Sequence, residues 1–278
     1  MSVIIHLMYN DFYNFKENPF NITPDPQFFF SGARHLEAIS HLLYGIDQRK
    51  GIILVTGEIG TGKTTICRTL LNKLNEKTKT ALILNPTFSD TQLLQIILND
   101  YGIASASKNK FTLVTTLNNF LLEQSNIGNN VVLIIDEGQN LSIHQLEQIR
   151  LLSNLETTKQ KLLQIILVGQ PELLEKLKLP ALRQLNQRIS VRFHLLPLTR
   201  EELNDYIFHR MQIAQEDISA KGKVEFTDSA IDTIFKISEG TPRVINILCD
   251  RALLAGFTND LRSIDKEIIH QCAKEVGK

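Results

Sequence analysis

An apolar run that leads directly into a glycine-rich loop is the feature that most constrains how this chain folds. Residues 51–56 read Gly-Ile-Ile-Leu-Val-Thr and residues 57–65 read Gly-Glu-Ile-Gly-Thr-Gly-Lys-Thr-Thr. Gly57, Gly62, Lys63 and Thr64 complete the pattern G-x-x-x-x-G-K-[ST], which places a phosphate-binding loop between a strand and a helix. The pattern predicts a site for a nucleoside triphosphate with magnesium.

The residue types in this loop explain how it would hold phosphates. Gly57, Gly60 and Gly62 tolerate positive φ, so the backbone can curl and point several N–H groups at phosphate oxygens. Lys63 supplies a positive charge for the β and γ phosphates, and the Thr64 hydroxyl is the expected magnesium ligand. The helix that begins near Lys63 directs its positive dipole end at the same place. We expect the nucleotide contacts to come from Gly57, Glu58, Ile59, Gly60, Thr61, Gly62, Lys63, Thr64 and Thr65.

A second motif follows a second apolar run. Residues 131–135 read Val-Val-Leu-Ile-Ile, as in a strand buried on both faces, and Asp136 and Glu137 come directly after it. Ligands of open α/β sheets bind at the carboxyl ends of strands. We therefore expect Asp136 to hold the magnesium through its water shell and Glu137 to polarise the attacking water. Together with the loop, these acids predict hydrolysis of ATP to ADP and phosphate rather than binding alone.

Strands and helices alternate along the first 198 residues. Alternation of this kind predicts a parallel five-stranded sheet with helices on both faces. The predicted strands are 52–56, 80–84, 131–135, 164–168 and 190–194, and the predicted helices are 34–48, 63–77, 90–101, 112–125 and 143–156. Three helix starts carry capping boxes, at Ser89 with Gln92, Ser142 with Gln145 and Thr199 with Glu202.

The pattern changes after Pro197, where strands stop and helical periodicity continues. Helices are predicted at 200–215, 228–238, 242–256 and 265–276. We expect an N-terminal arm over 1–30, a P-loop nucleotide-binding domain over 31–198 and a small all-helical lid over 199–278.

Composition argues against several classes of protein. Thirty basic and thirty acidic residues cancel, so the chain lacks the basic excess of a dedicated nucleic-acid binder. The three cysteines are scattered, which fits a reducing compartment, and the seven histidines show no metal-ligand spacing. No apolar stretch reaches the length of a membrane span, and the apolar start lacks the basic residues of a signal peptide. We expect a cytoplasmic protein, with Met1 or Met8 as its start.

Three further places carry candidate functional residues, each with a structural alternative. Gln170 follows the fourth predicted strand, where it could touch the γ phosphate or the attacking water, or form a simple turn with Pro171. Arg183 and Arg188 precede the fifth strand; one could serve a neighbouring subunit's phosphates, or both could lie on a solvated helix face. Arg243 falls in the first turn of a lid helix, able to reach the phosphates or to act structurally.

These motifs, in this order, resemble those of AAA+ ATPases. More closely, the chain resembles the ExeA/GspA-type ATPases of bacterial general secretion and their short MshM-like forms, with Ala usual in that family where Gly138 stands here. The matching stretches are Asn18-Pro19-Phe20, Thr23-Pro24-Asp25-Pro26, Phe28-Phe29-Phe30, Leu43-Tyr44-Gly45-Ile46, the phosphate loop, residues 133–141, residues 150–157, residues 168–173, Arg183-Gln184-Leu185, Gln187-Arg188-Ile189, Pro242-Arg243, Ile245-Asn246 and Leu248-Cys249-Asp250.

The resemblance implies further roles. Gln170 looks like the sensor-1 residue, Arg188 (or Arg183) like the arginine finger and Arg243 like sensor 2. Residues Asn18 to Phe20 and the Tyr44-Gly45-Ile46 region look like the adenine-side wall. An arginine supplied by the next subunit implies a homo-oligomer.

Three functions follow as hypotheses. The first is a cytoplasmic, Mg²⁺-dependent ATPase that energises assembly of a secretion or pilus apparatus, held at the inner membrane through a partner. The second is an ATP-switched DNA-binding regulator resembling the TniB/TnsC transposition ATPases, which would show salt-dependent DNA binding. The third is a nucleotide switch that scaffolds partners with little turnover, against which the intact Glu137 argues.

Overall fold

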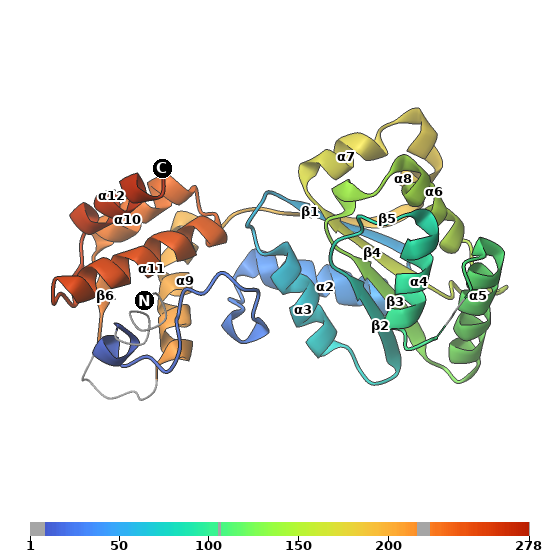
Figure 1. Ribbon diagram of the computed structural model, residues 1–278, viewed down its shortest axis with the longest axis horizontal. Helices are drawn as coiled ribbons and strands as arrows, with labels where there is room; N and C mark the ends of the chain where they lie inside the picture. The colour runs from blue at the N-terminus through green and yellow to red at the C-terminus, as the bar shows by residue number, and fades with distance from the viewer. Residues whose placement is uncertain (1–8, 105–106, 216–222, 278) are drawn as a thin grey trace. The chain divides into compact units, whose positions relative to one another are not determined.

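The computed structural model describes residues 9–104, 107–215 and 223–277, which form two compact units (Figure 1). The sheet unit comprises Arg34–Ile59 and Ile66–Leu195. The helical unit comprises the described residues up to Ala33, the loop segment Gly60–Thr65 and the described residues from Leu196 onward.

The sheet unit is built on five parallel strands in the order β2-β3-β4-β1-β5. The strands are β1 (Ile52–Gly57), β2 (Thr78–Ile83), β3 (Asn130–Ile135), β4 (Gln164–Gly169) and β5 (Ile189–Leu195). Every residue of β1 and of β4 is buried, as expected for strands covered on both faces. This confirms the predicted five-stranded parallel sheet.

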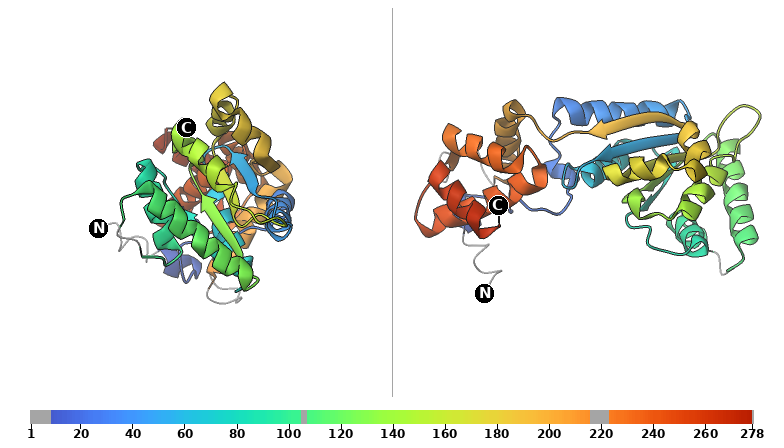
Figure 2. Two further views of the ribbon diagram at one scale, coloured as in Figure 1. Left: turned by 90° about the vertical axis from the view of Figure 1, so that its right-hand side faces the viewer. Right: turned by 90° about the horizontal axis from the view of Figure 1, so that it is seen from above.

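Helices cover both faces of this sheet, as the two views in Figure 2 show. They are α2 (Ala33–Asp47), α3 (Lys63–Lys73), α4 (Asp90–Asp100), α5 (Lys110–Asn126), α6 (Ile143–Leu152), α7 (Pro171–Leu177) and α8 (Arg183–Arg188), with short 3-10 turns η2 (Gly138–Asn140) and η3 (Pro180–Leu182). All three predicted capping boxes are confirmed, each with both reciprocal hydrogen bonds.

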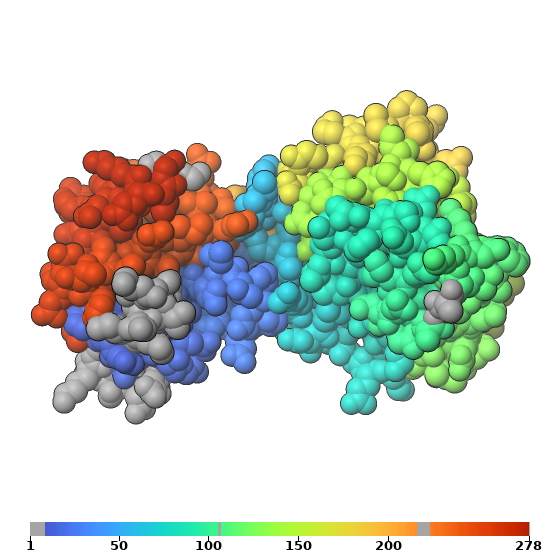
Figure 3. Space-filling model, viewed as in Figure 1, coloured from blue at the N-terminus to red at the C-terminus, as the bar shows by residue number. Residues whose placement is uncertain are grey.

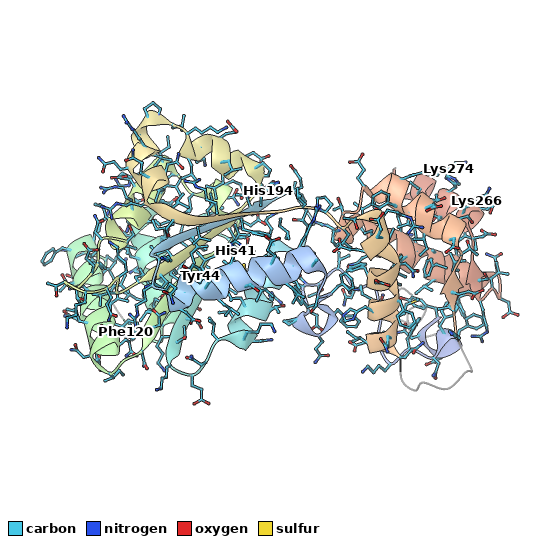
Figure 4. All side chains as sticks on the ribbon, turned by 180° about the vertical axis from the view of Figure 1, so that it is seen from behind. His41, Tyr44, Phe120, His194, Lys266 and Lys274 are labelled. Carbon is cyan, nitrogen blue, oxygen red and sulfur yellow. The ribbon has the colours of Figure 1, made fainter. Side chains whose placement is uncertain are left out.

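Alternating strand residues build the two layers of the core. Leu54, Leu133 and Leu167 face one way and pack with leucines of α4, α5 and α6. Figure 3 shows this side, where residues of α4 and α5 cover the strands. Figure 4, drawn from behind, shows α2 lying across the other face. There Gly45 permits close packing, because a Cβ at this position would lie 2.4 Å from Cδ1 of Ile53 in β1.

Several element boundaries differ from the prediction, for local reasons. β2 begins at Thr78 rather than Thr80, because an edge strand tolerates polar residues on its open side. α3 ends at Lys73, four residues early, where Asn75 accepts hydrogen bonds from both the backbone N–H and the hydroxyl of Thr78. α6 ends at Leu152 rather than residue 156. The short helices α7 and α8 were not predicted, since neither is long enough to show a helical period.

The helical unit contains η1 (Pro26–Phe28), α9 (Arg200–Ala214), α10 (Asp228–Ser238), α11 (Pro242–Thr258) and α12 (Lys266–Glu275). It departs from the all-helical prediction in one respect. The two-residue strands β6 (Glu225–Phe226) and β7 (Ser263–Ile264) pair in parallel. Strands this short leave no periodic signal in a sequence.

The N-terminal arm packs into the helical unit through a buried arginine. Arg210 of α9 is only 7% exposed, and its guanidinium donates to the carbonyls of Pro19 (2.6 Å) and Asn21 (3.0 Å). The guanidinium also lies 4.8 Å from the centre of the Phe28 ring. A buried cation is tolerated here because carbonyl oxygens and an aromatic face replace its water shell. The arm is therefore part of this unit's core.

Candidate active site

The carboxyl ends of three adjacent strands carry the predicted catalytic motifs. β4 lies between β1 and β3, and all three strands are parallel, so their carboxyl ends meet at one edge of the sheet. β1 ends at Gly57, where the phosphate loop begins; β3 ends one residue before Asp136; and β4 ends one residue before Gln170. The topology therefore places Gln170 between the strand of the loop and the strand of the two acids.

The loop has the backbone that phosphate binding requires. Gly60 and Gly62 both take left-handed conformations, with φ of 82° and 98°, and α3 begins at Lys63. Thr61 is fully buried and Lys63 is 6% exposed. A backbone that alternates between left-handed and other conformations turns successive N–H groups toward one concave side, which makes an anion-binding nest. The helix start adds its positive dipole end.

Asp136 is a buried carboxylate fixed by the backbone around it. It is 1% exposed, and its N–H donates to the carbonyl of Ile83 at the end of β2 over 2.8 Å. Its Oδ1 accepts the N–H of Glu137 over 2.8 Å. A buried carboxylate at the end of a parallel strand is placed to carry a negative charge toward a bound cation.

Glu137 takes a strained backbone conformation, with φ of 52° and ψ of 39°. A residue with a Cβ adopts this left-handed region at a cost of about 1–2 kcal/mol. Strain of this kind persists where the surrounding structure enforces it, and it often marks functional positions. Here it turns the chain sharply between β3 and η2.

Two glutamine amides converge on the Glu137 carboxylate. Nε2 of Gln170 donates to Oε2 of Glu137 over 3.2 Å, and Nε2 of Gln139 donates to the same oxygen. The backbone N–H of Gln170 donates to Oε1 of Gln139 over 3.0 Å, closing a ring of three residues. Glu137 and Gln170 are predicted site residues, whereas Gln139 is not predicted, because its only signal in the sequence is a polar side chain two positions after Glu137.

The two candidate finger arginines begin and end α8, and both are exposed. Neither forms a hydrogen bond with Glu137, Gln139 or Gln170. Glu156 has a pKa below its usual value, chiefly because Lys161 hydrogen-bonds its carboxylate and to a smaller extent because Arg188 is near. Arg183 and Arg188 therefore both lie at the surface of the sheet unit.

The remaining predicted site residues belong to the helical unit. Arg243 is the second residue of α11, and its N–H donates to the carbonyl of Gly60 over 3.2 Å. The Asn18 side chain donates to Asp250 over 2.8 Å and accepts the N–H of Phe20 over 2.8 Å. Phe20 is 1% exposed, with its ring edge-on to Phe226. Asn18 and Phe20 therefore make structural contacts in the arm, and their role toward adenine stays a prediction.

The donor types found in the phosphate loop and directly after β3 fit magnesium. Mg²⁺ prefers hard oxygen ligands and is held in nucleotide sites by one or two protein oxygens together with phosphates and water. The Thr64 hydroxyl and the buried Asp136 carboxylate are donors of this kind.

Among the described residues, every helix is too short or too polar to span a bilayer.

The fold and the motifs define a P-loop NTPase of the AAA class. The model of the AAA domain family matches residues 46–177. Solved structures share the fold: ORC2 of Aeropyrum pernix superposes with a TM-score of 0.66 at 14% identity, covering 91% of this chain and 72% of that one. The RuvB Holliday junction branch migration motor of Thermotoga maritima gives 0.54 at 20% identity, covering 86% and 68%.

The resemblance to the GspA-type proteins is also confirmed. Over 273 residues the chain is 42% identical to the general secretion pathway protein A of Aeromonas hydrophila. The match covers 97% of this chain and 49% of that protein. The chain thus spans about half the length of this relative, and its residues 46–177 match the AAA domain family.

Proposed function

We propose that this chain binds ATP with Mg²⁺ and hydrolyses it to ADP and phosphate. The observation that carries the proposal is the Glu137 carboxylate, held by amides at the end of β3 beside the strand of Gln170. A carboxylate fixed in this way can orient a water molecule and accept its proton. A protein that only bound nucleotide would have no need for this arrangement.

The other residues would supply binding and charge. The N–H groups of residues 57–65 would cradle the phosphates, and Lys63 would neutralise charge on the β and γ phosphates. The Thr64 hydroxyl and the Asp136 carboxylate would hold Mg²⁺, which when bound offsets charge that develops on the phosphate oxygens. Gln170 would contact the γ phosphate or the water. Arg243, in the first turn of α11, would contact the phosphates. Asn18 and Phe20 would border the adenine.

The finer function concerns what the hydrolysis drives. The similarity of this chain to a protein named for general secretion supports a role in energising assembly of a secretion or pilus apparatus. We propose that it acts in the cytoplasm, where ATP is available, as a homo-oligomer bound to apparatus proteins at the inner membrane. The exposed Arg188 supports oligomerisation, since a finger must be free to enter a neighbour's site.

The test is ATP turnover by the purified protein beside the variant Glu137→Gln, with and without duplex DNA. We expect turnover with Mg²⁺ that is lost in the variant and indifferent to DNA. Glu123→Gln, at an exposed position of α5, is the matched control and should behave as wild type. Wild-type protein that binds ATP without turnover would overturn the hydrolysis proposal. DNA-stimulated turnover would instead favour the transposition-like regulator.

A further inference from the structure

Glu137, Gln139 and Gln170 are joined by hydrogen bonds into a ring. Gln139 is the member of this ring to which the sequence motifs assign no role. Its side chain uses both ends of the amide: Oε1 accepts the backbone N–H of Gln170 and Nε2 donates to Oε2 of Glu137. A backbone N–H can only donate, so Oε1 must face Gln170 and Nε2 must then face the carboxylate. The orientation of the amide is thus fixed by chemistry.

The backbone of Gln139 is held as firmly as its side chain. Nζ of Lys176, on α7, donates to the carbonyl of Gln139 over 2.6 Å and to the carbonyl of Leu141 over 2.8 Å. These carbonyls belong to the η2 turn and the residue after it, whose own helical bonding is incomplete. The turn that carries Gln139 is therefore clamped to α7, the helix that follows Gln170.

The end of β4 leaves room for this side chain. A Cβ on Gly169 would lie 2.9 Å from Oε1 of Gln139 and 2.9 Å from Cδ2 of Leu173. A side chain at position 169 would displace the Gln139 amide from the N–H of Gln170, so the glycine permits the close approach. The packing at Gly169 thus depends on the same amide that contacts Glu137.

We infer that Gln139 is a positioning residue that fixes the Glu137 carboxylate for its part in hydrolysis and ties it to the end of β4. The Gln139 and Gln170 amides both donate to Oε2 of Glu137, and neither donates to Oε1 of Glu137. A carboxylate held at one oxygen cannot rotate freely, and its other oxygen keeps a defined direction toward the attacking water. The inference rests on the proposed function, because it concerns the residue that would activate water.

The substitutions Gln139→Leu and Gln139→Glu separate this role from general damage. Leu removes both hydrogen bonds, whereas Glu keeps the size of the side chain but cannot donate and sets a second carboxylate beside Glu137. Misplacement of a catalytic group by about 1 Å costs up to 100-fold in rate. We expect kcat to fall about 10- to 100-fold in both variants, with little change in KM or in the affinity for a fluorescent ATP analogue.

Gln160→Leu is the matched control, because its amide donates to Ser125 elsewhere in the sheet unit. The decisive step repeats Gln139→Leu in a Glu137→Gln background. A positioning residue acts through Glu137, so its loss should not lower the residual rate further. A further fall of the same size as in the wild-type background would overturn the inference, as would a normal kcat in folded Gln139→Leu and Gln139→Glu. Absence of wild-type turnover would overturn the proposed function and the inference together.

Discussion

The side-chain amide of Gln170 donates a hydrogen bond to Oε2 of Glu137 over 3.2 Å, although the two residues are 33 positions apart. They meet because β3 and β4 are adjacent and parallel, with Ile135 opposite Leu167 near their ends. The sheet itself therefore brings a donor from one strand to the acid of the next. Any change that shortens either side chain should break the contact.

Gln170→Asn tests this contact directly. Asparagine keeps the amide but is one methylene shorter, so it cannot span the distance to Glu137. If Gln170 positions the carboxylate or the water, we expect kcat to fall about 10-fold or more with nucleotide affinity nearly unchanged. Steady-state kinetics and nucleotide titration measure the two quantities. Equal kcat in the variant and the wild type would show that the bond has no part in turnover.

The motifs that could be predicted from the sequence are those formed entirely by residues that are neighbours along the chain. The phosphate loop and the run ending in Asp136 and Glu137 are contiguous, and strands buried on both faces leave unbroken apolar runs. The alternation of strands and helices along the chain and the three helix starts marked by capping boxes followed from the same local signals.

What escaped prediction depends on contacts between distant segments. Gln139 acquires its partners only because β4 lies beside β3, and no local pattern distinguishes it from a surface glutamine. Arg210 likewise looks like an ordinary helix-face arginine until the arm residue Pro19 is packed against it. The helices α7 and α8 are too short for periodicity to reveal them.

Gly240 is a position where an added methyl group should be costly. Its φ is +74°, and a Cβ would lie 2.0 Å from the carbonyl oxygen of Leu198. We expect Gly240→Ala to destabilise the helical unit by more than about 3 kcal/mol, since the left-handed backbone and the backbone clash both oppose it. Gly128→Ala is the matched control, because it has φ of +82° and open space around it. Gly128→Ala should lower the free energy of unfolding by only about 1 kcal/mol.

Chemical denaturation measures both variants against the wild type. The comparison isolates the clash with Leu198 from the cost of positive φ, because both glycines share the latter. Equal losses of unfolding free energy at Gly240 and Gly128 would show that the Leu198 segment moves aside without penalty.

His209 should make the helical unit sensitive to acid. Burial lowers the pKa of its imidazole below the usual 6.5, and the nearby Arg210 lowers it further, while the Phe29 carbonyl that bonds Nε2 over 3.1 Å opposes them. The unfolded chain then binds the proton more readily than the folded one. The stability this group contributes is present above about pH 6.5 and is lost as the pH falls through the lowered folded-state value.

Gln at position 209 keeps a donor near the place of Nε2 but does not titrate. We therefore expect the Tm of the wild type to fall more than that of His209→Gln between pH 7.5 and pH 5.5. His270→Gln, which replaces an exposed histidine on α12, is the matched control and should follow the wild type. Parallel Tm curves for wild type and His209→Gln would contradict the assignment.

Mixing two inactive variants should reveal whether Arg188 acts on a neighbouring subunit. Arg188→Ala leaves its own Glu137 intact, and Glu137→Gln leaves its own Arg188 intact. If the arginine acts across an interface, a Glu137→Gln subunit can supply it to an Arg188→Ala site. Random mixing at equal amounts would then give about a quarter of the sites both groups, because half carry Glu137 and half of those have an intact neighbour.

We expect the mixture to turn over ATP well above the mean of the two separate preparations, approaching about a quarter of the wild-type rate per subunit. Arg183→Ala, at the exposed first residue of the same helix, is the comparison, and its own turnover should remain near that of the wild type. If Arg183 were the finger, the pattern would reverse: Arg183→Ala would be inactive and rescued by mixing, and Arg188→Ala would be active alone. A mixture of Arg188→Ala and Glu137→Gln no faster than the mean of its parts would argue that Arg188 serves its own chain.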